Sequence, residues 1–83
     1  MGAVKVLVVD DDRTVRNVIC RALSEEYETV TAENGLDGIE KVQSENPDFV
    51  LLDVGMPGLN GYEVCDRLKQ NPATQDKPVL FLS

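Results

Sequence analysis

The stretch VLVVDDD, residues 6 to 12, joins residues that need opposite surroundings. The apolar run is short and rich in β-branched residues. It belongs to the segment Val4 to Val9, which has the pattern of a strand buried on both faces of a parallel sheet. The three aspartates that follow need water or a cation around their carboxylates. The stretch therefore predicts a buried strand that carries acids to one end of a sheet.

Strand-like and helix-like segments alternate along the rest of the chain. We expect strands over residues 4–9, 28–32, 48–53 and 78–83, and helices over residues 13–26, 34–46 and 62–71. Alternation with short loops is typical of parallel strands joined by right-handed crossovers. The sequence predicts an α/β fold: one domain over residues 1–83, built as a doubly wound parallel sheet with four strands and three helices.

Two of the expected helices carry apolar residues at a spacing that predicts one apolar face on each. These residues are Val15, Val18, Ile19, Ala22 and Leu23 in the first helix, and Val64, Cys65 and Leu68 in the third. Asp12 or Thr14 is expected to cap the start of the first helix. The segment 28–32 is short and more polar, which fits a strand at the edge of the sheet.

Composition excludes several classes of function. The 83 residues include 15 acidic and 8 basic side chains and no histidine, for a formal net charge of -7. A nucleic-acid surface needs a basic patch, so no nucleic-acid partner is expected. Without histidine, a Ser-His-Asp triad and a His-rich metal site are excluded. Cys20 and Cys65 lack metal-site spacing and are expected to be thiols in a reducing cytoplasm. No segment has the pattern of a signal peptide or a membrane span.

Polar residues end three of the expected strands. Asp10 and Asp11 follow the first strand, Asp53 ends the third, and Ser83 ends the fourth. The functional crevice of an open parallel sheet lies at the carboxyl ends of its strands. If the first and third strands are neighbours, three carboxylates lie close together there, and they repel one another unless they are protonated or bind a cation. Oxygen ligands beside a flexible loop suit Mg²⁺ or Mn²⁺. A carboxylate can also attack a phosphoryl group and form an acyl phosphate.

Three stretches carry a resemblance to a known family. VLVVDDDRTVR (6–16), DFVLLDVGMPGLNGYEV (48–64) and PVLFLS (78–83) together resemble the receiver domain of two-component response regulators. The resemblance covers the whole chain and implies a flavodoxin-like receiver fold with strand order 2-1-3-4-5. It implies a signalling domain that is not an enzyme and whose partner is a histidine kinase or a phosphotransfer protein.

The resemblance also implies a role for each matching residue. Asp53 is the expected phospho-acceptor. Asp11 and Asp53 are expected to bind Mg²⁺ directly, together with the backbone carbonyl of Gly55, and Asp10 is expected to hold the ion mainly through water. The hydroxyl of Ser83 is expected to form a hydrogen bond with a phosphoryl oxygen.

The chain departs from the family after Ser83, where receivers continue with a lysine-bearing fifth strand and a last helix. The lysines of this chain are expected to lie away from the acids; they are Lys5, Lys41, Lys69 and Lys77. We therefore expect a C-terminally truncated receiver with impaired phosphorylation. Its apolar fourth strand, over residues 79–82, is expected to pair between chains in a homodimer or larger assembly.

Other interpretations remain open. Asp10, Asp11 and Asp53 can be ordinary loop and turn acids. The chain can be an aspartate-nucleophile phosphohydrolase, although such enzymes often carry a second acid where Gly55 stands and need a substrate pocket. It can also be a fragment that only self-associates.

Overall fold

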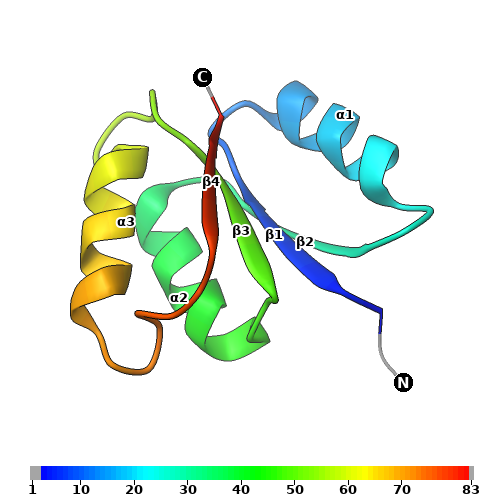
Figure 1. Ribbon diagram of the computed structural model, residues 1–83. Helices are drawn as coiled ribbons and strands as arrows, with labels where there is room; N and C mark the ends of the chain where they lie inside the picture. Colours follow the sequence, from blue (N-terminus) through cyan, green and yellow to red (C-terminus); the bar gives the residue numbers. More distant parts are fainter. Residues whose placement is uncertain (1–2, 83) are drawn as a thin grey trace.

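The computed structural model describes residues 3–82, and within them strands and helices alternate strictly (Figure 1). The elements are β1 (Lys5–Val9), α1 (Arg13–Leu23), β2 (Glu28–Ala32), α2 (Gly35–Glu45), β3 (Phe49–Asp53), α3 (Gly61–Gln70) and β4 (Val79–Leu82). All strands pair in parallel in one sheet of order β2-β1-β3-β4. The predicted α/β fold is confirmed for these residues. The largest difference in bounds is at α1, which ends at Leu23 rather than at Glu26.

β1 lies inside the sheet, between β2 and β3, and this explains its composition. Its residues Val6 to Val9 are fully buried, with 0% of their surface exposed. Leu7 and Val9 belong to the main core, which also includes buried residues of β3 and of the two helices α2 and α3. These two helices cover one face of the sheet, and α1 lies on the other face (Figure 1). The polar strand β2 is an edge strand, as predicted.

The α1 side of the sheet is covered only in part. No residue of α1 is buried, and the side chain of Val18, expected on its apolar face, is 63% exposed. Leu51 of β3 is half-buried, and its register partner Leu80 is 56% exposed. The reason is that α1 contacts β1 and β2, and no second helix of residues 3–82 lies on this face over β3 and β4 (Figure 1).

β4 is the other edge strand of the described sheet. It pairs only with β3 within residues 3–82. Its residues are all apolar, and Phe81 is 44% exposed even though its ring packs against the ring of Tyr62 at 4.9 Å between centroids. An apolar edge strand with open backbone groups is a site for further strand pairing.

Candidate functional site

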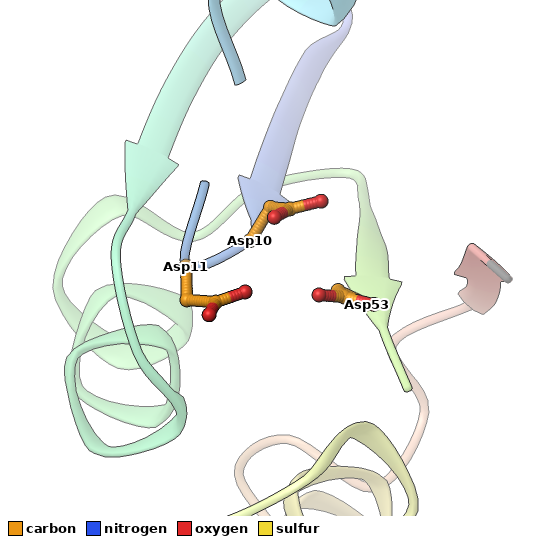
Figure 2. Close-up of side chains that lie close together, drawn as sticks. All are labelled: Asp10, Asp11 and Asp53. Carbon is orange, nitrogen blue, oxygen red and sulfur yellow. The ribbon is translucent and has the colours of Figure 1, made fainter. Parts of the chain in front are cut away.

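Three carboxylates converge at the carboxyl ends of β1 and β3. One oxygen from each of Asp10, Asp11 and Asp53 lies within 4.8 Å of the others, and Figure 2 shows these side chains gathered around a common space. The convergence follows from strand order. β1 and β3 are neighbours in parallel register, with Val9 opposite Leu52, so the residues after β1 meet the last residue of β3 at the same edge of the sheet. The predicted meeting of the three acids is confirmed. Their roles in metal binding and phosphorylation remain predictions.

The three acids differ in burial, and this decides their electrostatics. Asp10 is only 5% exposed, Asp53 is half-buried, and Asp11 is exposed. Burial raises the pKa of Asp10 above its ordinary value, and a backbone hydrogen bond from Asp12 offsets part of this effect. The negative charges of Asp53, Asp11 and Asp12 raise the pKa of Asp10 further. The ionised form of Asp10 therefore costs free energy in the folded protein when no cation is bound.

The loop after β1 is held by hydrogen bonds that lead directly into α1. The backbone N–H of Asp10 donates to the carbonyl of Ala32 at 3.2 Å, and the N–H of Asp12 donates to Oδ1 of Asp10 at 2.9 Å. Oδ1 of Asp12 in turn accepts from the N–H groups of Thr14 and Val15 at 2.8 and 3.3 Å. The predicted capping role of Asp12 is therefore confirmed. The third aspartate of the opening stretch starts the helix, and the first two face the site.

Asp53 is positioned by the loop between β3 and α3. Its Oδ1 accepts a hydrogen bond from the N–H of Gly55 at 3.1 Å. The first residue of α3, Gly61, lies so close to β3 that a Cβ on it would collide with the carbonyl oxygen of Asp53 and come within 2.9 Å of the Cα of Val54. Asn60 caps α3 at this point through a capping box. The start of α3 therefore packs directly on the backbone of the proposed phospho-acceptor.

The acids line one side of a surface hollow. Its lining consists of Asp10, Asp11, Asp12, Val15, Ile19, Asp53 and Leu82. Gly55, the expected source of a backbone ligand, is exposed two residues after Asp53. Ser83, the expected phosphoryl contact, lies outside the described residues, and its neighbour Leu82 lines the hollow.

The four lysines lie away from the carboxylates, as expected. Lys5 pairs with acids of β2 and α2, at 3.6 and 3.4 Å, at the opposite end of β1. Lys41 pairs with an acid one turn earlier in α2, at 3.6 Å. Nζ of Lys69 donates to backbone carbonyls of the loop before β4, and Nζ of Lys77 donates to Asn46. Within residues 3–82 no side-chain cation forms an ion pair with the three acids of the site.

One residue of the site was missed by the sequence analysis. Nη1 of Arg16 donates a hydrogen bond of 2.7 Å to the carbonyl oxygen of Asp10. The available signal was its position one helical turn after Asp12, which puts a long basic side chain near the loop. That position alone does not say which group the guanidinium reaches.

The fold and the acidic site together define a receiver-type signalling domain, and comparison with known proteins agrees. Residues 6–83 match the family described as the response regulator receiver domain. The chain belongs to this family, which confirms the resemblance found in the sequence. Receiver domains are signalling domains and not enzymes of the usual kind, and they interact with histidine kinases or phosphotransfer proteins.

Among curated relatives, the chain is similar to the response regulator MprA of Mycobacterium ulcerans, with 43% identity over 82 residues. The same-named protein of Mycobacterium bovis is 42% identical. Each alignment covers 98% of this chain. The chain spans about a third of the length of these relatives, 34% and 35%.

Two solved structures show the same fold. The N-terminal domain of a response regulator receiver protein from Methanoculleus marisnigri superimposes with a TM-score of 0.93 at 39% identity, covering 95% of this chain and 65% of that one. The chemotaxis protein CheY4 of Vibrio cholerae gives a TM-score of 0.89 at 30% identity, covering 98% of this chain and 68% of that one. Within residues 3–82 of the present chain, no helix has the length and apolar content needed to cross a membrane.

Proposed function

We propose that Asp53 accepts a phosphoryl group from a histidine kinase or phosphotransfer protein, with Mg²⁺ bound beside it. The observation that carries the proposal is the convergence of three carboxylates from two neighbouring strand ends. Asp11 and Asp53 bind the ion directly with the backbone carbonyl of Gly55, and Asp10 acts mainly through water. The two thiols, which form no disulfide, support a reducing, cytoplasmic setting.

The donor set suits Mg²⁺ or Mn²⁺. All three side chains offer hard oxygen ligands, and Mg²⁺ is usually held by one or two carboxylates, several waters and a phosphate oxygen. Asp11 is exposed and Asp53 half-buried, so water and a phosphoryl group can reach them. The raised pKa of Asp10 marks an electrostatic cost that a cation relieves. When bound, the ion neutralises negative charge on the incoming phosphoryl oxygens.

The chain's own residues then perform a phosphoryl transfer. A carboxylate oxygen of Asp53 attacks the phosphorus, the bond from phosphorus to the donor's leaving group breaks, and an acyl phosphate forms on Asp53. The N–H of Gly55 already donates to Oδ1 of Asp53, which orients the carboxylate and leaves the second oxygen for attack. The predicted hydrogen bond from the Ser83 hydroxyl to the phosphoryl group is part of this proposal.

Acetyl phosphate with Mg²⁺, followed by intact mass and peptide mapping, tests the acceptor. We expect one added phosphoryl group, located on Asp53 and absent from Asp53→Asn. The matched control is Asp76→Asn, which removes an exposed acid in the loop before β4 and is expected to be modified like the parent chain. Phosphate on another residue, or undiminished labelling of Asp53→Asn, would show that Asp53 is not the acceptor.

We expect phosphorylation of this 83-residue chain to be slow, since no side-chain cation of residues 3–82 pairs with the carboxylates of the site. Loss of one group aimed at developing charge typically costs about 10²–10³ in rate. Added methylammonium should therefore speed the labelling of Asp53 at constant ionic strength. Tetramethylammonium, which cannot donate a hydrogen bond, should have no such effect. Equal rates in both salts would contradict the explanation.

We also propose that the chain is an N-terminal portion of a receiver domain, with β4 at the edge of its sheet. Through Val79–Leu82 of this strand, it self-associates as a homodimer or larger assembly. The N–H of Val50 donates to the carbonyl of Pro78, and that of Val54 to the carbonyl of Leu82. Because backbone groups alternate in direction along a strand, those of Val79 and Phe81 face outward. Antiparallel pairing of two β4 strands about a two-fold axis then sets Leu80 opposite its copy.

A further inference from the structure

The hydrogen bond from Arg16 to the carbonyl of Asp10 is a link between α1 and the acidic loop that the proposed chemistry does not use. It is 2.7 Å long and half-buried. Arg16 also borders a hollow whose other lining residues are Thr31, Glu33, Asp37 and Lys41. Arg16 therefore lies where α1, the end of β2 and the start of α2 come together, beside the acids but outside their hollow.

This bond acts on the peptide that joins Asp10 to Asp11. The carbonyl of Asp10 and the N–H of Asp11 lie in one rigid plane, so the direction of the carbonyl also sets the orientation of the backbone entering Asp11. The N–H of Asp10 is bound to Ala32 at 3.2 Å, and the Asp10 carboxylate is bound by the N–H of Asp12 at 2.9 Å. The Arg16 bond completes this set by holding the remaining backbone group of Asp10.

The direction of the Asp11 side chain depends on that peptide more than the directions of the Asp10 and Asp12 side chains do, because both of these accept hydrogen bonds from backbone N–H groups. The side chain of Asp11 is exposed, and it makes no hydrogen bond to any other residue between 3 and 82, yet it points toward Asp53 (Figure 2). Its direction is thus set by the backbone before it. We propose that Arg16 is a positioning residue, which holds the Asp10–Asp11 peptide so that the Asp11 carboxylate meets Asp53 around a divalent cation. This inference rests on the proposed metal site.

The charge of Arg16 acts in the opposite direction to its hydrogen bond, and this makes the proposal testable. A guanidinium repels a nearby divalent cation, so removing its charge alone should tighten binding, by about twofold at roughly 10 Å and physiological salt. Removing a group that orients a metal ligand typically weakens binding by about 10- to 100-fold. The sign of the change in affinity therefore separates positioning from charge.

Arg16→Met removes the charge and the donors but keeps an unbranched apolar stem. The control is Arg13→Met, which removes the same charge at the exposed first residue of α1, two residues after Asp11, where the side chain makes no hydrogen bond to another residue of 3–82. Mg²⁺ is titrated into both variants and the parent, well below their melting temperatures, while amide shifts are followed. We expect Arg16→Met to bind Mg²⁺ about tenfold more weakly than the parent, and Arg13→Met to bind it equally or more tightly.

Arg16→Met binding Mg²⁺ as tightly as the parent or more tightly would overturn the inference. An osmolyte can be added to all samples if that variant is only partly folded. If the parent itself binds no Mg²⁺, the proposed metal site is wrong. The positioning role of Arg16 is then tested separately, by comparing the spectra of the metal-free proteins. The amide of Asp11 should then shift in Arg16→Met well beyond its shift in Arg13→Met. An unshifted amide overturns the positioning role.

Discussion

At the scale of single residues, Asp10 shows how the site differs from an ordinary cluster of loop acids. It sits at the end of a fully buried strand and is itself 5% exposed, so its charge has lost most of its water. Its neighbours in the cluster add like charge instead of compensating it. A cation bound here reduces this repulsion, and without the cation the repulsion lowers the stability of the folded protein.

Asp10→Asn should make the metal-free protein more stable at pH 7. Folding raises the pKa of Asp10 above its ordinary value of 3.8, so the folded state binds more protons than the unfolded state between that value and the higher folded pKa. The favourable contribution of Asp10 to the stability of the folded state is present below pH 3.8 and is lost as the pH rises through the pKa that Asp10 has in the folded state. Asparagine keeps the oxygen that accepts from Asp12.

Thermal melts of the parent and of Asp10→Asn between pH 3.5 and 8 measure this effect. The variant should melt higher at pH 7, and the difference should shrink as the pH falls. Asp76→Asn, at an exposed loop position, makes the same change in net charge and is expected to melt like the parent at pH 7. A lower melting temperature for Asp10→Asn than for the parent at pH 7 would contradict the electrostatic reading.

Mg²⁺ should raise the melting temperature of the parent chain. A ligand that binds only the folded state adds about 2.7 kcal/mol when its concentration is 100 times its Kd. Asp11→Asn and Asp53→Asn should each lose most of this shift, because they remove proposed direct ligands. The amides of Asp10, Asp11, Asp53 and Gly55 should move on titration with millimolar Mg²⁺. Unmoved amides would reject the metal site.

At the scale of elements, the approach of α3 to the end of β3 keeps Asp53 in place. Gly61 has no side chain at the point of contact, and the capping box of Asn60 and Glu63 starts the helix there. The N–H of Asn60 donates to Glu63 at 3.0 Å, and the N–H of Glu63 donates back to Asn60 at 3.0 Å. The helix can therefore begin directly against backbone atoms of Asp53 and Val54.

Gly61→Ala should destabilise the protein by roughly 1–3 kcal/mol, the usual cost of forcing extra volume into a packed site. The added Cβ meets backbone atoms of Asp53 and Val54, which cannot rotate away as a side chain can. Gly55→Ala is the control, because its Cβ would meet only Oδ1 of Asp53 at an ordinary 3.8 Å. Urea denaturation of both variants measures the difference. Equal stability of the two variants would argue against the close approach.

At the scale of the whole molecule, the two faces of the sheet are covered unequally. On the α2 and α3 side, Val42, Val64 and Leu68 complete a core in which they are 1–2% exposed. On the α1 side, the sheet stays open over β3 and β4, and Leu80 is 56% exposed. A small domain buries only about 60% of its unfolded surface. The open face, and an edge strand that has no second partner within residues 3–82, therefore favour association.

Leu80→Lys should shift the assembly toward monomer, because antiparallel pairing of two β4 strands sets residue 80 opposite its copy and like charges there repel. The control is Leu36→Lys, at a leucine that is 64% exposed on α2, away from β4. Sedimentation velocity across a range of concentrations compares both variants with the parent. A parent that is monomeric throughout would reject self-association. A dimer unchanged by Leu80→Lys would reject this surface alone.

The sequence by itself determined the order of the elements, the parallel sheet and the convergence of Asp10, Asp11 and Asp53. The order of the elements and the parallel pairing follow from local periodicity and short loops. The convergence also requires the first and third strands to be neighbours, and that strand order came from the resemblance to receiver domains. The capping role of Asp12 was equally readable, because a cap acts on its own helix.

Only the tertiary structure decided which side chains meet across elements. The bond from Arg16 to Asp10 and the contact of Gly61 with Asp53 depend on how closely each helix approaches the sheet. The exposure of Val18 was missed for the same reason: helical spacing defines an apolar face, but burial of that face requires a second surface against it. Periodicity is a property of one segment, and packing is a property of two.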